Sequence, residues 1–272
     1  RPPRSTLFPY TTLFRSLNII SKCGKTPWVL PDAIPDADFI IGLSYTSRLQ
    51  GQNRIMGFAN VFNQYGRWQF YSGGSKIFSF DDRIKYFQEL VANTLTQLNL
   101  SDTPSIYFHY TKRFSADERK VILQSARKIR PNGIYNFVSI NTTHNIRLYD
   151  KRPESNGSLR RGSYVAISPR KVLISTTGYN PYKKIIGTPI VLEITIDIEL
   201  PEGKEYYNPD LKSLATQILS LTKLNWASTE SICGEPITIK YAKDIARFME
   251  VFSRLDEPIE INPILTKTPW FI

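Results

Sequence analysis

Cysteine and histidine are scarce in this chain of 272 residues, and their scarcity excludes several classes of protein. The two cysteines, Cys23 and Cys233, are too few for a disulfide scaffold and fit a reducing cytosol. The two histidines, His109 and His144, form no Cys/His cluster with the spacing of a zinc site. No apolar run is long enough to span a bilayer, and no signal peptide is visible. The sequence therefore predicts a cytoplasmic protein without a structural zinc or a membrane partner.

Acidic residues are also in the minority. The chain has 24 Asp and Glu against 35 Lys and Arg, which gives a formal net charge of +11. With 41% hydrophobic and 12% aromatic residues, the chain can bury a sizeable core, so its charge is that of a globular basic protein. This combination favours a polyanionic partner, with nucleic acid as the first candidate. A basic protein without such a partner would have the same composition.

The first part of the chain has no helical or strand periodicity. Residues 5–8 nearly repeat as residues 11–14, a pattern typical of a non-native leader derived from a sequencing adapter, and we interpret residues 1–16 in this way. Without Arg1, Arg4 and Arg15 the formal charge is still +8. We expect residues 17–37 to be the end of one region and a linker, and residues 38–272 to form the main domain.

The order of predicted elements favours a mixed sheet covered by helices. Apolar alternation predicts two strands at 54–64 and 67–75, joined by a tight turn at 64–66. Asp81 is expected to cap a helix that reaches Leu98, and Ser115 with Glu118 has the pattern of a capping box. The remaining predicted elements are strands at 38–47, 104–110, 134–140, 163–168, 171–177 and 190–198, a helix from Asn208-Pro209 to Leu221, and a last helix at 239–252.

The strand at 38–47 carries the first candidate site. Four apolar residues and Gly42 lead into a run of hydroxyl side chains that begins at Ser44. A buried strand that turns polar at its carboxyl end delivers a side chain to a site at that edge of the sheet.

Several short stretches, taken in order, resemble the PIWI domain of prokaryotic Argonaute proteins. They are 22–28 (KCGKTPW), 41–44 (IGLS), 109–114 (HYTKRF), 177–178 (TG), 187–189 (GTP), 224–226 (LNW), 240–242 (KYA) and 270–272 (WFI). The resemblance covers nearly all of residues 17–272. It implies an α/β fold of the RNase H-like kind, in which a mixed sheet is flanked by helices and holds a short guide strand paired with a target. It also implies a fragment that lacks the amino-terminal part of an Argonaute of the catalytically inactive type, short or long-B-like.

The positions that match the metal ligands of slicing members of that family do not carry carboxylates. The first falls on Ser44, the third on Thr111 and the fourth on Lys243, or on Lys240 if the register slips. The second is a glutamate in that family, but no glutamate occurs between Leu17 and Gln88. A hydroxyl supplies no charge to a doubly charged metal, and a lysine repels it. The resemblance therefore implies a site without catalytic metal, although displaced ligands remain an alternative.

Other residue types at this site have simpler interpretations. Asp81 and Asp82 are better interpreted as helix caps than as substitutes for the missing glutamate. The hydroxyls of Ser44 and Thr111 fit strand ends bonded to neighbouring backbone. His109 lies among apolar neighbours and is expected to be a hydrogen-bonded core residue.

The resemblance also places nucleic-acid contacts. Lys22 matches a lysine that contacts the 5′ phosphate of the guide, and the carboxylate of Ile272 is expected near the same pocket, where it could help to hold Mg²⁺. The alternative for Lys22 is an interaction with the helix dipole. Asn18 stands where some relatives have a second lysine. Asn225, Trp226 and Ser228 resemble a loop that touches the guide backbone, although Trp226 also fits a core position. Further candidates for phosphate contacts are Arg113, Arg160, Arg161, Lys183 and Lys184, for each of which a solvated surface charge is the alternative.

The sequence thus predicts guide-dependent nucleic-acid binding without slicing, in prokaryotic defence against invading DNA and with an associated effector protein. The guide and the target, each DNA or RNA, are the expected partners. An active guided endonuclease and a non-guided single-strand binder are the alternatives.

Overall fold

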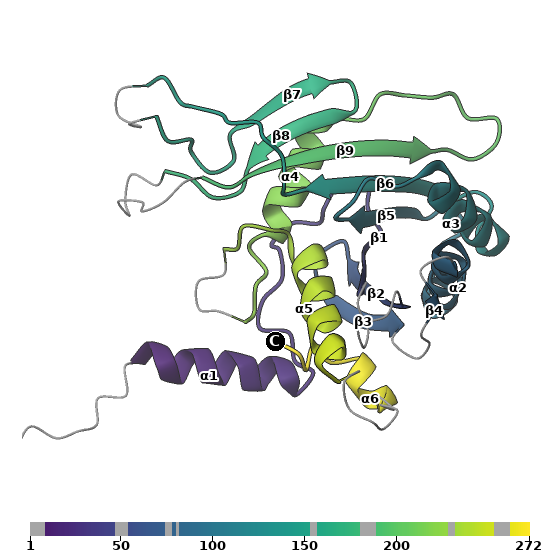
Figure 1. Ribbon diagram of the computed structural model, residues 1–272, viewed down its shortest axis with the longest axis horizontal. Helices are drawn as coiled ribbons and strands as arrows, with labels where there is room; N and C mark the ends of the chain where they lie inside the picture. The colour runs from purple at the N-terminus through teal and green to yellow at the C-terminus, as the bar shows by residue number, and fades with distance from the viewer. Residues whose placement is uncertain are drawn as a thin grey trace, which may run out of the picture.

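A mixed β-sheet forms the centre of the protein, and helices cover both of its faces (Figure 1). The computed structural model describes residues 9–46, 54–73, 78–79, 82–152, 157–179, 189–227, 232–252 and 262–272. Across these residues the sheet has nine strands in the order β3-β2-β1-β5-β6-β9-β8-β7, with β4 paired to β2. The predicted fold class, a mixed sheet flanked by helices, is confirmed.

The elements follow the chain in this order. The strands are β1 (Phe39–Thr46), β2 (Arg54–Asn63), β3 (Trp68–Gly73), β4 (Phe78–Ser79), β5 (Ser105–Tyr110), β6 (Ile134–Asn141), β7 (Tyr164–Ser168), β8 (Lys171–Ser175) and β9 (Val191–Glu199). The helices are α1 (Pro9–Lys22), α2 (Arg83–Thr96), α3 (Ala116–Ile129), α4 (Leu211–Leu221), α5 (Ile237–Phe252) and α6 (Pro263–Thr266).

Strand β1 is an interior strand of the sheet and is apolar on both faces. Ile40, Ile41 and Leu43 are fully buried, with successive side chains on opposite faces. The strand runs antiparallel to β2 and parallel to β5, and β5 runs parallel to β6. The carboxyl ends of β1, β5 and β6 therefore meet at one edge of the sheet, called here the carboxyl edge.

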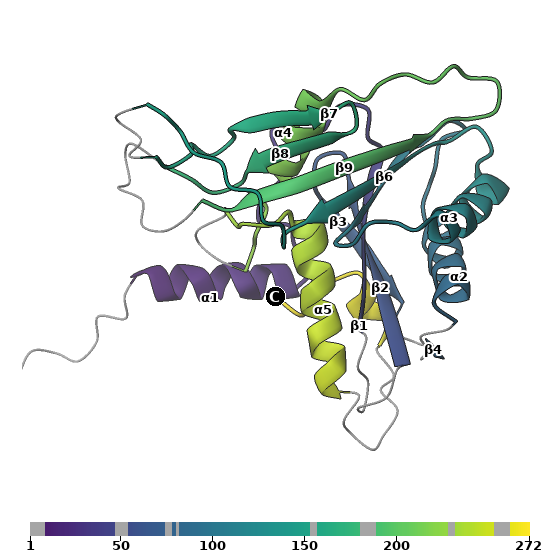
Figure 2. The same ribbon diagram turned by 45° about the horizontal axis from the view of Figure 1, so that its top comes forward.

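Two helical layers bury the two faces. One face packs against α2 and α3 through a core that includes Leu43, Phe87 and Phe108. The opposite face packs against α5 and the chain terminus, with Trp68, Tyr241 and Phe271 in the core. Figure 2 shows α5 on one side of β1 and β2, with α2 and α3 on the other. Farther along the sheet, α4 covers β8 and β9.

Local signals in the sequence account for several element ends. Gly66 closes the β2–β3 hairpin with φ +68°, a conformation that glycine adopts without strain. The predicted capping box is confirmed, because the Ser115 hydroxyl accepts from the Glu118 amide at 3.1 Å and the Glu118 carboxylate accepts from the Ser115 amide at 2.7 Å. The apolar carboxyl terminus packs into the core, since Phe271 is only 5% exposed.

Other expectations were wrong in detail or stay untested. Helix α4 begins after Asp210 rather than at Asn208-Pro209, because the Asp210 carboxylate accepts from the Lys212 amide at 2.9 Å and caps the helix there. Helix α2 follows Asp82, whose side chain makes no capping bond, and Asp81 lies outside the described residues. Helix α1 begins at Pro9, so the second half of the presumed leader is helical despite its lack of period.

Strand β4 and helix α6 were not predicted, since two and four residues carry too little pattern. Within the described ranges, no helix has the length and apolar character needed to cross a bilayer.

Candidate nucleic-acid interface

Ser44 and Thr111 lie side by side at the carboxyl edge, near the ends of β1 and β5. The parallel register pairs Leu43 of β1 with Tyr110 of β5, so the next residue of each chain stands at the same level. Ser44 is 8% exposed and Thr111 is half-buried. Neither hydroxyl hydrogen-bonds to another group in the described part of the chain, so the expected bonds to neighbouring backbone are not found. Two uncharged hydroxyls therefore stand at this point of the edge.

Tyr45 and Lys112, one residue farther along, bring a cation to the same edge. The Lys112 ammonium donates to the Tyr45 hydroxyl at 2.6 Å and lies 4.7 Å from the centre of its ring. The sequence analysis missed this pair. The parallel register of β1 and β5 was the signal that could have found it, because it places residue 45 opposite residue 112.

His109 is buried beneath α5, in contact with Thr238. Its side chain is fully buried, and Nδ1 lies 3.0 Å from the Thr238 hydroxyl. Burial lowers the pKa of His109 to about 3, because the charged imidazolium would lose its hydration. The prediction of a hydrogen-bonded core histidine is confirmed.

Gly42 lets α5 approach β1 closely. A Cβ added at Gly42 would lie 2.0 Å from the Thr238 carbonyl oxygen, so no larger residue fits without moving the helix. The first turn of α5 consequently rests on β1 two residues before Ser44.

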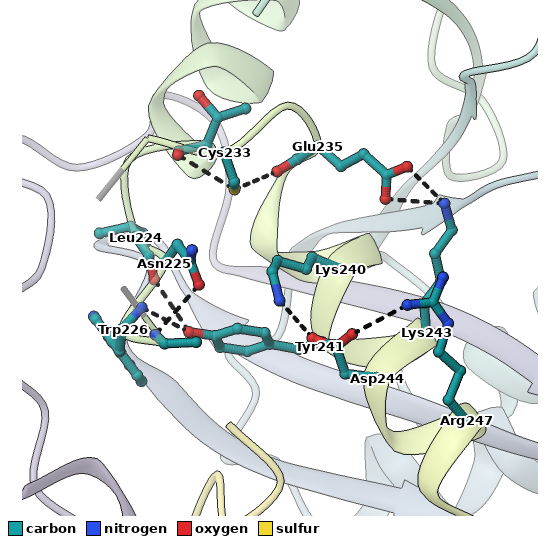
Figure 3. A network of polar contacts seen from close by, with 12 residues as sticks. Leu224, Asn225, Trp226, Cys233, Glu235, Lys240, Tyr241, Lys243, Asp244 and Arg247 are labelled. Atoms are coloured by element: carbon teal, nitrogen blue, oxygen red, sulfur yellow. Dashed lines mark hydrogen bonds and ion pairs between the residues drawn. The ribbon is translucent and has the colours of Figure 1, made fainter. Parts of the chain in front are cut away.

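The charged face of α5 is organised into ion pairs (Figure 3). Lys243 donates to both carboxylate oxygens of Glu235, at 2.7 and 2.9 Å. One turn away, Lys240 bonds Asp244 at 2.6 Å, and Arg247 lies 4.0 Å from the same carboxylate. The sequence analysis considered Lys243 without a partner. In the structure its partner is Glu235, which lies in the segment before α5.

Lys22 and the chain terminus lie close together. Lys22 is exposed at the last residue of α1, and the turn that follows has Gly24 at φ +76°. A Cβ at Gly24 would lie 3.2 Å from the Thr268 side chain, so this turn packs against the carboxyl-terminal segment. Both views show the carboxyl terminus beside the end of α1 (Figures 1 and 2). The structure therefore brings Lys22 and Ile272 to the same region of the molecule.

Comparison with known proteins gives a fold but no close relative. No protein-family model matches the sequence, and no curated protein sequence matches it. The solved structures include Aquifex aeolicus Argonaute, at 19% identity and a TM-score of 0.69 over 96% of this chain and 35% of that chain. Another is Aa-Ago with externally bound siRNA, at 20% identity and a TM-score of 0.70 over 96% of this chain and 34% of that one.

A third structure is Clostridium butyricum Argonaute bound to a guide DNA and a 19-mer target DNA. It matches at 22% identity and a TM-score of 0.67, over 89% of this chain and 31% of that chain. The chain has the fold of the PIWI region of Argonaute. It spans about a third of the length of these Argonautes, and at such identities the likeness concerns the fold alone.

The Argonaute fold implies a pair of divalent ions, but the residues present do not fit them. Divalent ions of this kind take several oxygen ligands, mainly carboxylates. The two hydroxyls at Ser44 and Thr111 carry no charge, and Lys243 is held in an ion pair with Glu235. Of the matched positions that the structure describes, Ser44, Thr111 and Lys243, none supplies a carboxylate.

The loop matched to a guide contact in Argonautes is largely a core element here. Trp226 is 1% exposed, and its indole donates to the Trp28 carbonyl at 3.1 Å. Trp226 therefore occupies a core position, which was one of its two interpretations, and its ring is not available for stacking on a base. Asn225 is 7% exposed, and its side chain accepts from the Ala227 amide at 3.3 Å. Ser228 lies outside the described residues.

The arginines proposed for the Argonaute-like channel differ in their roles. Arg161 donates to the Leu219 carbonyl at 3.0 Å and to the Thr222 hydroxyl at 2.6 Å, which closes the carboxyl end of α4. Burial lowers the pKa of its guanidinium. Arg161 thus has a structural role and is not the solvated surface charge considered as its alternative, while its contact with phosphate stays a prediction. Arg113 is exposed. Arg160 is half-buried, and its backbone forms an isolated β-bridge with Tyr179. Lys183 and Lys184 lie outside the described residues.

Proposed function

We propose that this chain is the PIWI part of an Argonaute-like protein that binds a short guide and its target without cutting them. The observation that carries the proposal is the carboxyl edge of β1 and β5. It presents Ser44 and Thr111 where a slicing member of the family presents carboxylates, within a fold that aligns with Argonautes over most of this chain.

The charge and the relatives support the binding half of the proposal. A formal charge of +11 suits contact with phosphate backbones, and such contacts leave sequence readout to base pairing between guide and target. Among the matched structures, one Argonaute is bound to a guide DNA and a target DNA, and another has siRNA bound externally.

The site proposed for the 5′ end of the guide consists of Lys22 and the terminal carboxylate of Ile272. A lysine on a flexible stem suits a phosphate, and a carboxylate beside it suits a shared Mg²⁺ ion. By analogy with the family alone, the biological role proposed is defence against invading DNA, through an effector that acts after target binding.

The test is a cleavage and retention assay on the protein that contains this chain. The protein is loaded with a 5′-phosphorylated guide and mixed with a labelled complementary target in Mg²⁺ or Mn²⁺. We expect the target to be retained and to remain intact. A product cut at one position opposite the guide would establish an active nuclease with displaced ligands.

The nucleic acid that copurifies with the protein separates the remaining alternatives. Short strands of uniform length with 5′ phosphates support guide binding. Strands of random length that moderate salt removes would indicate a non-guided single-strand binder instead.

A further inference from the structure

A small cavity lies between α4 and the sheet, away from the carboxyl edge. Its volume is about 170 Å³. Tyr107 of β5 and Ile198 of β9 line it, and both pair with Asn136 near the start of β6. That row of the sheet lies three residues before the carboxyl end of β5, so the cavity is separate from the edge that holds Ser44 and Thr111.

Gln217 of α4 contributes a polar side chain to the cavity lining. Its side chain is only 3% exposed and contributes to the cavity lining. Neither its carbonyl oxygen nor its amide nitrogen has a hydrogen-bond partner among the described residues. A buried carboxamide without partners destabilises the fold, which favours a ligand that supplies one donor and one acceptor.

The rest of the lining selects against anions. Asp36 and Asp210 stand in the lining, which contains no lysine or arginine. The carboxylate of Asp210 already accepts from the Lys212 amide at the start of α4, whereas that of Asp36 accepts no bond within the described ranges. Burial, with smaller contributions from Tyr207 and Asp36, raises the pKa of Tyr107 to about 12, so its hydroxyl stays protonated and neutral.

The walls suit a flat ring. Ile196, Ile198 and Leu214 supply apolar surface, and Tyr107 supplies an aromatic side chain. An apolar cavity of about 150 Å³ holds one benzene ring in another protein, so about 170 Å³ is enough for a single heterocyclic base.

We propose that this cavity binds the amino-bearing base of a nucleoside, with adenine as the best match. A glutamine carboxamide makes a two-point contact with adenine, in which its oxygen accepts from the amino group and its nitrogen donates to a ring nitrogen. The ring then lies between Tyr107 and the aliphatic side chains. The sugar faces the rim, where Asp36 disfavours a phosphate.

The experiment measures binding of adenosine, inosine and AMP to the full chain by calorimetry or ligand-observed NMR. Inosine replaces the amino group by an oxo group, so the atom that would donate to the Gln217 oxygen becomes an acceptor while the ring nitrogen N7 stays an acceptor. The Gln217 carboxamide can then satisfy only one of the two contacts. We expect adenosine to bind, and inosine and AMP to bind roughly tenfold more weakly or not at all.

Two variants at Gln217 and Gln97 separate the cavity from the rest of the surface. Gln217→Leu removes both polar atoms, so we expect it to abolish adenosine binding and to keep or raise the melting temperature. Gln97→Leu is the matched control, because this exposed carboxamide lies at the end of α2, where it donates to the Asn93 carbonyl. It should leave adenosine binding unchanged.

Asp36→Asn tests the charge of the rim. Asp36 has φ +54°, a conformation that asparagine also tolerates, so the backbone should be preserved. We expect the variant to reduce the preference for adenosine over AMP.

An oligonucleotide with one unpaired adenosine identifies the source of the base. If binding of this strand depends on Gln217 while free adenosine does not bind, the adenine contact is retained, its ligand belongs to a strand, and the exclusion of phosphate by Asp36 is refuted. The proposal is overturned if neither ligand shows binding that depends on Gln217, or if AMP binds wild type as tightly as adenosine does. The guide-binding proposal is unaffected by either result, because its contacts lie elsewhere.

Discussion

Lys243 of α5 holds both carboxylate oxygens of Glu235, and this pair occupies the position where the family resemblance expects a metal ligand. Each side chain is close to 30% exposed, so water screens the attraction. Such a pair contributes little stability, about 0–1 kcal/mol. Its larger effect is electrostatic, because Glu235 neutralises a cation that would otherwise be available to a phosphate.

Replacing Glu235 by Gln should therefore tighten nucleic-acid binding. The released Lys243 gains one phosphate contact, so the slope of log affinity against log salt should become steeper by about 0.7–0.9. Titrations of a labelled strand at several salt concentrations measure this slope, and urea unfolding should shift by less than about 1 kcal/mol.

The double variant Glu235→Gln with Lys243→Gln is the control for this change. It should return the slope to the wild-type value. An unchanged slope in Glu235→Gln alone would mean that Lys243 does not reach nucleic acid.

Arg161 and Arg113 should respond differently to the same substitution by Gln. Arg161 closes the carboxyl end of α4 with two hydrogen bonds, so Arg161→Gln should cost about 1–3 kcal/mol of unfolding free energy. Arg113 is exposed, so Arg113→Gln should change stability by less than about 0.5 kcal/mol and reduce the salt slope of binding by about 0.7–0.9. Urea unfolding and salt titrations of both variants test the pair. Equal stability of the two would refute the structural role of Arg161.

Gly42→Ala should be among the most damaging single-methyl changes in the protein. The added Cβ would meet the Thr238 carbonyl at 2.0 Å, and backbone cannot move aside as a flexible side chain does. We expect a loss of about 3 kcal/mol or more. Gly203→Ala is the control, because its Cβ meets nothing within 4 Å and the change suffers only from φ +82°, which costs about 1 kcal/mol. Thermal unfolding measures the stability of both variants. Similar losses of unfolding free energy in Gly42→Ala and Gly203→Ala would argue against a close approach of α5 to β1.

Local patterns in the sequence were sufficient for most of the fold. Alternating apolar residues located β2 and β3, and the capping box located the start of α3, because both signals are contained in a few neighbouring residues. The order of strands and helices then favoured a mixed sheet. The start of α4 was missed because Asn208-Pro209 and Asp210 are both good capping signals, and only the tertiary position of the chain selects the second.

The candidate site was harder to predict, because its contacts join distant segments. Nothing near Arg161 in sequence indicates that it bonds the end of α4, 58 residues away. The burial of Trp226 depends on Trp28, which is 198 residues distant. Side chains that carry charge or aromatic surface suit both a core and an interface, so the sequence left both interpretations open and the structure distinguished them.

His109 should make the protein less stable as the pH falls. Its pKa is about 3 in the folded state against an ordinary value of 6.5, so the unfolded chain binds a proton that the folded chain rejects. Stability from this residue is complete above pH 6.5 and is lost as the pH falls toward 3, by up to about 1.4 kcal/mol per pH unit. Urea unfolding between pH 7 and pH 4 measures the slope. His109→Asn removes the titrating group, and a slope as steep as that of wild type would show that other residues cause it.

Lys22 should determine the preference for a 5′ phosphate. Wild type is expected to bind a 5′-phosphorylated strand more tightly than the same strand with a 5′ hydroxyl, and Lys22→Met should reduce this preference roughly tenfold, as for the loss of one charge-assisted hydrogen bond. Lys25→Met is the matched control, because Lys25 is also exposed and follows the same turn. EDTA should reduce the preference in wild type if the Ile272 carboxylate shares Mg²⁺ with the phosphate. If both lysine variants lose affinity equally for the two strands, Lys22 contributes only general positive charge, and the 5′-phosphate site must lie elsewhere.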